Sequence, residues 1–218
     1  RAVQFDVRHL KSLSQVIEDR RATNHFTNDS VSDDDLKTIL HFAGQAPSGY
    51  NLQPWRFIVV REPENRKRLQ KVSYGQEKVS EAAAVIIFLG MKEETKKWAS
   101  DVFYEGVRRG LGHVENVEKN MKGAIDFITG FGMTTWVNKH VMISFSFAML
   151  MAEALGYDTA PMEGFEPDKV KKEFAIPEEA EVIALLAIGK AKEPDKGYPG
   201  RFPLERIAFA EKYGMSLK

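Results

Sequence analysis

The chain has 218 residues, among them 16 glycines, 9 prolines and no cysteine. Without cysteine it cannot form a disulfide scaffold, a thiolate zinc site, an iron–sulfur cluster or a cysteine nucleophile. Its 31 Lys and Arg residues balance 31 Asp and Glu residues, and this neutral charge argues against a nucleic-acid-binding protein. The longest apolar run, residues 141–150, is too short for a membrane span, which needs about 20 apolar residues. With no targeting segment visible at the start, we expect a cytoplasmic protein that binds neither nucleic acid nor membranes.

The predicted elements alternate between helices and strands along the chain. Ser32 is the expected N-cap of one helix, because three aspartates follow it and suit the positive end of a helix dipole. Three strands read as continuous apolar runs, which is typical of strands buried on both faces. In chain order we expect a helix at 12–21, a helix after Ser32, a strand at 56–61, helices at 63–72 and 76–83, a strand at 85–89, a weakly predicted helical segment at 92–118, a helix at 136–155, an irregular segment at 158–165, a helix at 167–174, a strand at 182–188 and a short last strand at 207–209. Strands separated by helices predict one α/β or α+β domain of three layers over residues 1–218, without a linker that divides it.

The helix at 136–155 carries apolar side chains on every face, including Met142, Phe145 and Met149. A helix that is hydrophobic all round must be buried all round. One small domain can hardly cover such a long helix, so we expect it to form a subunit interface. A central helix in a monomer is the alternative.

Motifs for common chemistries are missing from the sequence. The five histidines show no ligand spacing with carboxylates, so no metal site is predicted. No glycine-rich phosphate loop precedes a helix, and there is no Gly-x-Ser-x-Gly elbow. Small and polar residues gather instead in the irregular segments 20–24, 46–56 and 160–165 and around Arg201.

The arginines in these segments suggest an anionic ligand, because a guanidinium group matches the geometry of phosphate. The alternative is that Arg20 and Arg21 form a solvated helix C-terminus, an end that favours cations. From the residue types alone, the prediction extends no further than a ligand that carries an anion, such as a cofactor.

The order and spacing of these segments resemble the FMN-dependent nitroreductase family. The matching motifs are Arg-Arg-x-x-x-x-Phe at 20–26, Ala-Pro-Ser-Gly-x-Asn-x-Gln-Pro-Trp-x-Phe at 46–57 and Pro-Met-Glu-Gly-Phe at 161–165, followed by Gly189 and the run 201–205. The resemblance covers about residues 12–213 and is poor at about 92–135, which is expected to be a variable helical insertion. It implies an α+β fold of three α/β/α layers, with a mixed sheet flanked by helices. It also implies an intertwined homodimer in which a C-terminal arm, about residues 197–218, reaches across the partner.

The resemblance further implies which residues hold FMN. Arg20 and Arg201 would bind the phosphate, and Gln76 or Lys78 would approach the pyrimidine edge of the ring. Backbone N–H groups of residues 162–164 would lie beside flavin N5 and O4. The full implied set is Arg20, Arg21, Ala22, Asn24, Pro47, Ser48, Gly49, Asn51, Gln76, Lys78, Pro161, Met162, Glu163, Gly164 and Arg201. No side chain is nominated as an acid or base, because solvent or the flavin can carry the protons.

The activity implied by the resemblance is that of an NAD(P)H oxidoreductase. NADH or NADPH would deliver hydride to bound FMN and leave, and a small electrophilic acceptor such as a nitroaromatic or a quinone would take its place in a ping-pong cycle. One alternative is a flavoenzyme of the same fold that performs reductive dehalogenation or flavin fragmentation. The other is a dimeric flavin-binding protein without enzymatic activity.

Overall fold

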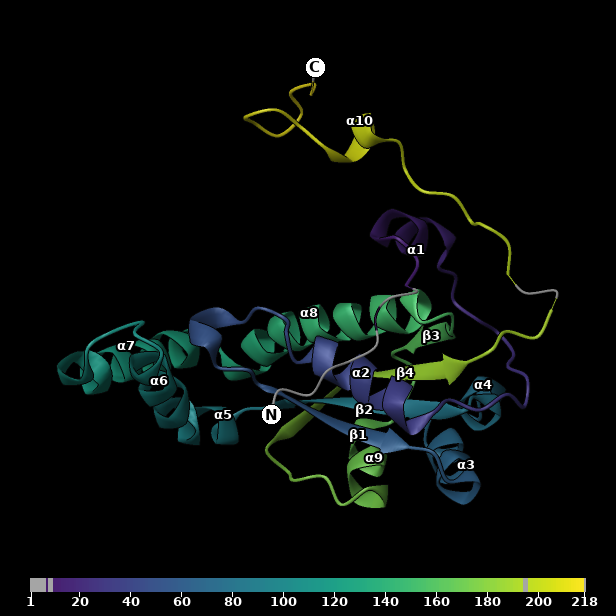
Figure 1. Cartoon of the computed structure of the whole chain (residues 1–218), viewed down its shortest axis with the longest axis horizontal. Coiled ribbons are helices and arrows are strands. Elements are labelled where there is room, and N and C mark those ends of the chain that lie inside the picture. The colour runs from purple at the N-terminus through teal and green to yellow at the C-terminus, as the bar shows by residue number, and fades with distance from the viewer. Residues whose placement is uncertain (1–6, 8–9, 194–195, 218) are drawn as a thin grey trace.

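The computed structural model describes residues 7, 10–193 and 196–217. Helices separate each strand from the next along this length (Figure 1). In chain order the elements are α1 (Leu13–Asp19), α2 (Asp33–Ala43), the 3-10 helix η1 (Gly49–Asn51), β1 (Trp55–Val60), α3 (Pro63–Lys71), α4 (Glu77–Glu81), β2 (Ala84–Met91), α5 (Glu93–Lys97), α6 (Ala99–Arg108), the 3-10 helix η2 (Val114–Asn116), α7 (Val117–Phe131), α8 (Met133–Ala154), β3 (Asp158–Met162), α9 (Pro167–Glu173), β4 (Ala180–Gly189) and α10 (Leu204–Ile207).

The four strands form one sheet in the order β1-β2-β4-β3, and each neighbouring pair runs antiparallel. The central strands β2 and β4 are buried along nearly their whole length. The expectation of burial on both faces is wrong for β1, an edge strand that is fully buried only at Trp55 and Val60. On the free edge of β3, the backbone at Ala22 runs parallel to the strand and forms one isolated bridge with Thr159. Pro161 is tolerated in β3 because an edge strand needs no donor on its outer side.

Two hydrophobic cores lie on opposite faces of the sheet, which confirms the three-layer α+β prediction. Alternate residues of β2 face alternate cores, as the two-residue repeat of a strand requires. Ile86 and Phe88 pack in the core under α2 and α8. Val85 and Ile87 pack on the other face, in the core that α3, α4 and α9 cover (Figure 1).

The helix that was predicted to follow Ser32 begins at Asp33, and the Ser32 side chain accepts a hydrogen bond from the Asp35 N–H at 3.1 Å. The segment expected to be helical at 92–118 divides into α5, α6 and η2, with Gly110 at a φ of 76° after α6. A positive φ suits glycine at the end of a helix. This local break explains why the helical prediction was weak there.

The expectation of an irregular segment at 158–165 is wrong for its first half, because Asp158–Met162 forms β3. Pro161 and Gly164 were interpreted as breakers, but the strand pairs with β4 from Asp158 to Met162 before the turn begins. The expected short strand at 207–209 is wrong as well. Ile207 is the last residue of α10 (Leu204–Ile207), and Phe209 makes one isolated bridge to Ser216.

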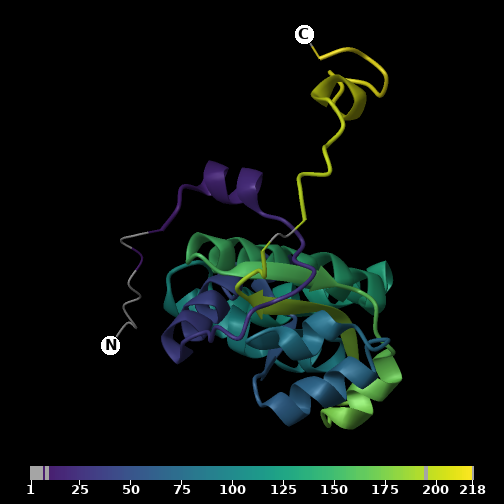
Figure 2. The same ribbon diagram turned by 90° about the vertical axis from the view of Figure 1, so that its right-hand side faces the viewer.

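The C-terminal segment, residues 196–217, extends away from the rest of the chain (Figure 2). Its apolar side chains are exposed, with Phe202 at 62%, Ile207 at 61% and Tyr213 at 93%. Exposed apolar residues that follow one another along an extended arm are typical of a segment that packs against a partner.

The long helix α8 is buried along one side against α2 and the sheet, with Val141, Phe145 and Ala148 in the core. Its other side is not covered in the same way, and Phe147 remains 39% exposed. Within the described residues, no helix combines the length and apolar character that crossing a membrane requires.

Gly90 in β2 is a position where the sheet and α8 come too close for a side chain. A Cβ atom at this position would lie 2.8 Å from Val137 Cβ and 3.3 Å from Ile183 Cδ1. We expect Gly90→Ala to lower the free energy of unfolding by about 1–3 kcal/mol, because overpacking strains a close-packed core. Urea unfolding of the two proteins measures this change.

Gly123 provides the matched control. It lies inside α7, and a Cβ atom there would meet nothing within 4 Å. Gly123→Ala should leave the chain equally stable or up to about 1 kcal/mol more stable, because alanine favours a helix over glycine. Equal effects of the two substitutions would contradict the close contact at Gly90.

Candidate functional site

Three arginines from distant parts of the chain line one open pocket of about 410 Å³. Arg20 and Arg21 follow the end of α1, and Arg201 comes from the C-terminal segment. The aromatic ring of Tyr198 lies between them, 4.7 Å from the Arg21 guanidinium and 5.8 Å from that of Arg201. The structure therefore brings together the three arginines that the sequence singled out.

Arg20, one of the residues that line this pocket, has an unsatisfied hydrogen-bond donor. Its Nη1 atom is buried and has no hydrogen-bond partner. A buried charged donor without a partner costs free energy, and phosphate, with its several acceptor oxygens, would provide one. The pocket therefore fits the phosphate group of a nucleotide cofactor.

The segment after Arg21 lies along the free edge of β3. Ala22 forms a parallel bridge with Thr159, and the Thr23 N–H donates to the Thr159 carbonyl at 2.9 Å. These contacts place the arginines at the start of β3. Asn24 follows as an exposed residue of the same loop.

The far end of β3 leads to the second group of predicted site residues. Met162 is buried, whereas Glu163 is exposed. Gln76 Nε2 donates to the Gly164 carbonyl at 2.8 Å and to the Ser73 carbonyl at 3.1 Å. A Cβ atom on Gly164 would lie 3.0 Å from Gln76 Nε2, so glycine permits this close approach.

Pro161 and Lys78 complete this part of the surface. Pro161 lies half-buried in β3, and Lys78 lies half-buried in α4. With the two groups just described, they define a strip of candidate site residues that follows β3 from the arginine pocket to Gly164. A long, flat ligand with a phosphate at one end would match this strip.

The loop that carries Asn51 has a strained backbone. Tyr50, Asn51 and Gln53 have φ values of 54°, 56° and 47°, in the left-handed region that is unfavourable for residues other than glycine. Ser48 Oγ accepts a hydrogen bond from the Gln53 N–H at 2.9 Å, and Leu52 is buried beneath the loop. Such strain is common at ligand sites, where the surrounding contacts maintain it.

This loop does not join the arginines within one chain. Gly49 lies against Trp136 and His140, near the start of α8. Pro47, Ser48 and Asn51 belong to the same loop. The arginine pocket lies near the other end of α8, where Arg20 acts electrostatically on Glu153. From Trp136 to Glu153 the helix rises about 25 Å at 1.5 Å per residue, and Figure 1 shows α7 and α1 near opposite ends of α8.

Glu153 is a buried carboxyl group that the sequence analysis missed. It is 8% exposed, and its Oε1 accepts a hydrogen bond from Thr159 Oγ1 at 3.1 Å. Burial, reinforced by the negative charge of Asp158, raises the pKa of Glu153 to about 7, although the Thr159 hydrogen bond and the positive charges of Arg20 and Lys11 oppose the shift. Glu153 thus interacts both with Arg20 of the arginine pocket and with Thr159 of β3.

Tyr198 was also missed, because the glycine- and proline-rich run around it indicates only a loop. No periodicity marks a single aromatic residue in such a run as a partner of arginine. Glu153 gave no signal either, since it reads as the polar end of an apolar helix. Both residues become visible only when residues distant in the sequence are brought together.

Comparison with known proteins gives a consistent result. A model of the nitroreductase family, described as "Nitroreductase family", matches residues 17–190. A Thermus thermophilus protein named NADH dehydrogenase is 33% identical over 190 residues, which is 86% of this chain and 90% of that protein. YodC of Bacillus subtilis, named as an NAD(P)H nitroreductase, is 29% identical over 84% of this chain and 90% of its own length. An Exiguobacterium sibiricum structure, named as a nitroreductase in complex with FMN, has a TM-score of 0.81 and 27% identity, covering 94% of this chain and 99% of that one.

The buried Glu153 predicts a specific dependence of stability on pH. Its ordinary pKa is 4.5 and its pKa in the folded chain is about 7, so the folded state binds the proton more tightly. The stabilising effect of that proton is fully present below about pH 4.5 and is lost as the pH rises through about 7. Glu153→Gln keeps a neutral side chain at all these pH values. Between about pH 5 and pH 8 we expect the wild-type chain to lose on the order of 2 kcal/mol of unfolding free energy relative to this variant.

Urea unfolding at the two pH values measures the difference. Glu178→Gln is the control, because the Glu178 side chain is 96% exposed and its loss should not change the pH dependence. A difference between wild type and Glu153→Gln that stays constant with pH would show that Glu153 is ionised throughout.

Proposed function

The chain belongs to the nitroreductase family and is an FMN-dependent NAD(P)H oxidoreductase, and we propose that it passes hydride in a ping-pong cycle from the nicotinamide to small electrophilic acceptors such as nitroaromatics or quinones. When bound, FMN supplies the redox chemistry by accepting hydride in one half-reaction and donating it in the other. The residues of the chain bind this cofactor, orient it and set its electrostatic surroundings.

The observation that carries the proposal is the arginine pocket with its unpartnered donor. Arg20 Nη1 is buried without a hydrogen-bond partner, and Arg21 and Arg201 line the same pocket. We assign the FMN phosphate to these three groups, since guanidinium donors bind phosphate through charge-assisted hydrogen bonds. The guanidinium groups of Arg21 and Arg201 both lie against the ring of Tyr198.

The strip along β3 would carry the rest of the cofactor, with Ala22 and Asn24 from the loop and Pro161 to Gly164 at the far end. Because Gln76 Nε2 donates hydrogen bonds to two backbone carbonyls, those of Ser73 and Gly164, we assign Gln76 to holding the turn at Gly164. Lys78 is then the group that approaches the pyrimidine edge of the ring. Backbone N–H groups from Met162 to Gly164 would act as donors to the flavin, and the exposed side chain of Glu163 is not required for this role.

A second copy of the chain would complete the site. Pro47, Ser48, Gly49 and Asn51 belong to the loop near the start of α8, whereas the arginines lie near its other end, so the role of these four residues in the same site requires a partner. An apolar groove of about 420 Å³ runs between α1 and α8 and is lined by Leu13, Ile17 and Phe147 among others. Together with the exposed apolar arm (Figure 2), this groove supports a homodimer, because obligate interfaces resemble a core cut in half.

Removing Arg201 should weaken the binding of FMN. We expect Arg201→Ala to cost about 1.5–3 kcal/mol of cofactor affinity, roughly 10- to 150-fold in Kd, because one charge-assisted contact to the phosphate is lost. Quenching of flavin fluorescence during titration of the FMN-free protein measures the affinity. Arg206→Ala is the matched control, since Arg206 lies on the same arm but stacks over Phe202; equal affinities for wild type and Arg201→Ala would show that the arm is wrongly assigned.

Reduction of the bound flavin tests the proposed half-reaction directly. Under anaerobic conditions, addition of NADH or NADPH should bleach the visible absorption of the FMN-loaded protein, and later addition of a quinone should restore it. Bound flavin that stays oxidised in an excess of both nicotinamides would overturn the redox proposal. Bleaching that a quinone or a nitroaromatic cannot reverse would instead favour a more specialised acceptor.

A charge placed in the apolar groove should separate the dimer. Phe147 is 39% exposed on α8 and lines the groove, so Phe147→Asp would bury an unpaired carboxylate at the proposed interface. We expect sedimentation to give two chains per particle for wild type and one for this variant. Leu111→Asp is the control, since Leu111 is 81% exposed outside the groove; a wild-type monomer that retains FMN in dilute solution would contradict the shared site.

A further inference from the structure

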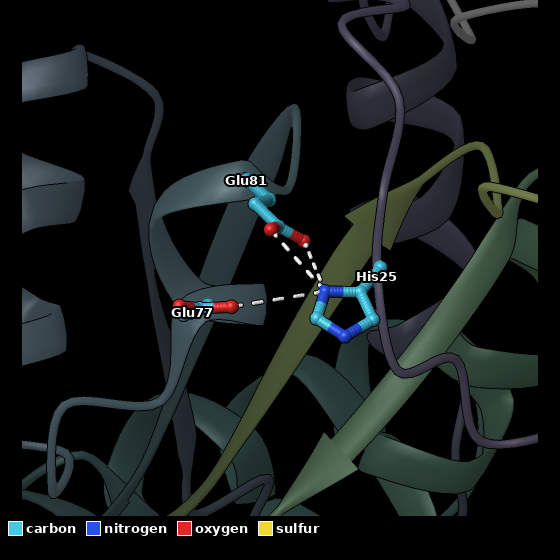
Figure 3. A group of neighbouring side chains, drawn as sticks. All are labelled: His25, Glu77 and Glu81. Carbon is cyan, nitrogen blue, oxygen red and sulfur yellow. Dashed lines mark hydrogen bonds and ion pairs between the residues drawn. The ribbon is translucent and has the colours of Figure 1, made fainter.

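A histidine and two glutamates converge beside the candidate site (Figure 3). His25 comes from the loop after Ala22, and Glu77 and Glu81 lie four residues apart on α4. Residues four apart on a helix face the same side. One ligand atom from each of the three residues lies within 4.8 Å of the others, although more than fifty residues separate the histidine from the glutamates in the sequence.

The distances match a small tetrahedral metal site. His25 Nδ1 lies 3.2 Å from Glu81 Oε2 and 3.9 Å from Glu77 Oε2. Zinc bonds to nitrogen and oxygen are about 2.0–2.2 Å long, so the ligand atoms of a tetrahedral site lie about 3.3–3.5 Å apart. All three ligand atoms lie within 4.8 Å of one another, and the Glu77 side chain is 71% exposed, so it has room to move toward the other two.

Acceptor atoms outnumber donors at this cluster. Nδ1 of His25 faces both oxygens of Glu81, at 3.3 and 3.2 Å, and one oxygen of Glu77. An imidazole nitrogen carries at most one proton, so it cannot donate to all three carboxylate oxygens at once, and the Phe26 N–H serves only one of them. A divalent cation would satisfy them together and balance the two carboxylate charges.

The backbone around the ligands is fixed in place. The His25 carbonyl accepts from the Lys192 N–H at 2.9 Å, and the Phe26 N–H donates to Glu81 Oε2 at 3.1 Å. On the other side, α4 is anchored by Val79, which is fully buried. Hydrogen bonds that orient a ligand carboxylate are typical of metal sites.

We propose that His25, Glu77 and Glu81 bind one divalent transition-metal ion of the zinc type. An imidazole with carboxylates suits zinc or a neighbouring transition metal better than magnesium, which prefers six oxygen ligands. The three protein ligands leave a fourth position for water or another small ligand. The ion would clamp the loop carrying Ala22 and Asn24 to the helix carrying Lys78, so its role is to hold two segments of the site in register.

Titration of the FMN-loaded, metal-free and untagged protein with zinc chloride tests this proposal. Calorimetry should show one saturable site per chain. The chain has no cysteine, so no thiolate site competes for the zinc. His25→Ala, Glu77→Gln and Glu81→Gln should each weaken binding at least about 10-fold. Excess magnesium should leave the zinc affinity unchanged.

His113→Ala is the matched control variant. His113 is an exposed histidine with a single carboxylate near it, since its Nδ1 lies 4.0 Å from Glu115 Oε1, and its loss should leave zinc binding unchanged. In wild type, zinc should also raise the Tm, and it should not do so in His25→Ala.

Absence of saturable binding would overturn the proposal, as would zinc binding that survives in all three ligand variants. Binding that is lost equally in His113→Ala would also overturn it, because it would indicate adventitious contact with surface histidines. The outcome is separate from that for the flavin site, since Arg201→Ala should lose FMN affinity without losing zinc affinity.

Discussion

Three guanidinium groups line one pocket, and this concentration of positive charge is the feature on which the rest of the site depends. Glu153 lies nearby with a pKa close to neutrality and offers only partial compensation. Arg20 keeps a buried donor without a hydrogen-bond partner, and leaving such a donor unsatisfied costs free energy. A phosphate group would supply acceptor oxygens and negative charge to all three arginines at once.

The free edge of β3 connects the arginine pocket to the remainder of the candidate site. An edge strand presents unpaired backbone groups, and here the loop after Arg21 covers part of them through Thr159. The same strand ends at the turn that Gln76 holds at Gly164. One short strand thus sets the spacing between the arginine pocket and the opposite end of the strip, and two peripheral segments, α4 and the loop around His25, flank it.

Local patterns in the sequence were sufficient to predict the elements with strong physical signals. The Ser32 cap, the doubly buried runs of β2 and β4 and the apolar helix α8 were all predicted, because each depends on residues close together in the chain. β3 was missed because Pro161 reads as a breaker, whereas on an edge strand its missing donor has no consequence. The cluster of His25 with Glu77 and Glu81 was missed for a different reason, since its ligands meet only after the sheet has formed. The convergence of the arginines was anticipated through motif spacing, but Tyr198 between them was not.

The loop at Tyr50, Asn51 and Gln53 holds three left-handed residues where glycine would be more comfortable. Random substitution followed by selection for heat resistance alone would tend to relax this loop, because its geometry opposes stability. If these side chains are kept despite their cost in stability, their benefit must lie in a property other than stability. Stabilising substitutions in this chain are therefore best sought outside this loop, so that its backbone geometry is left unchanged.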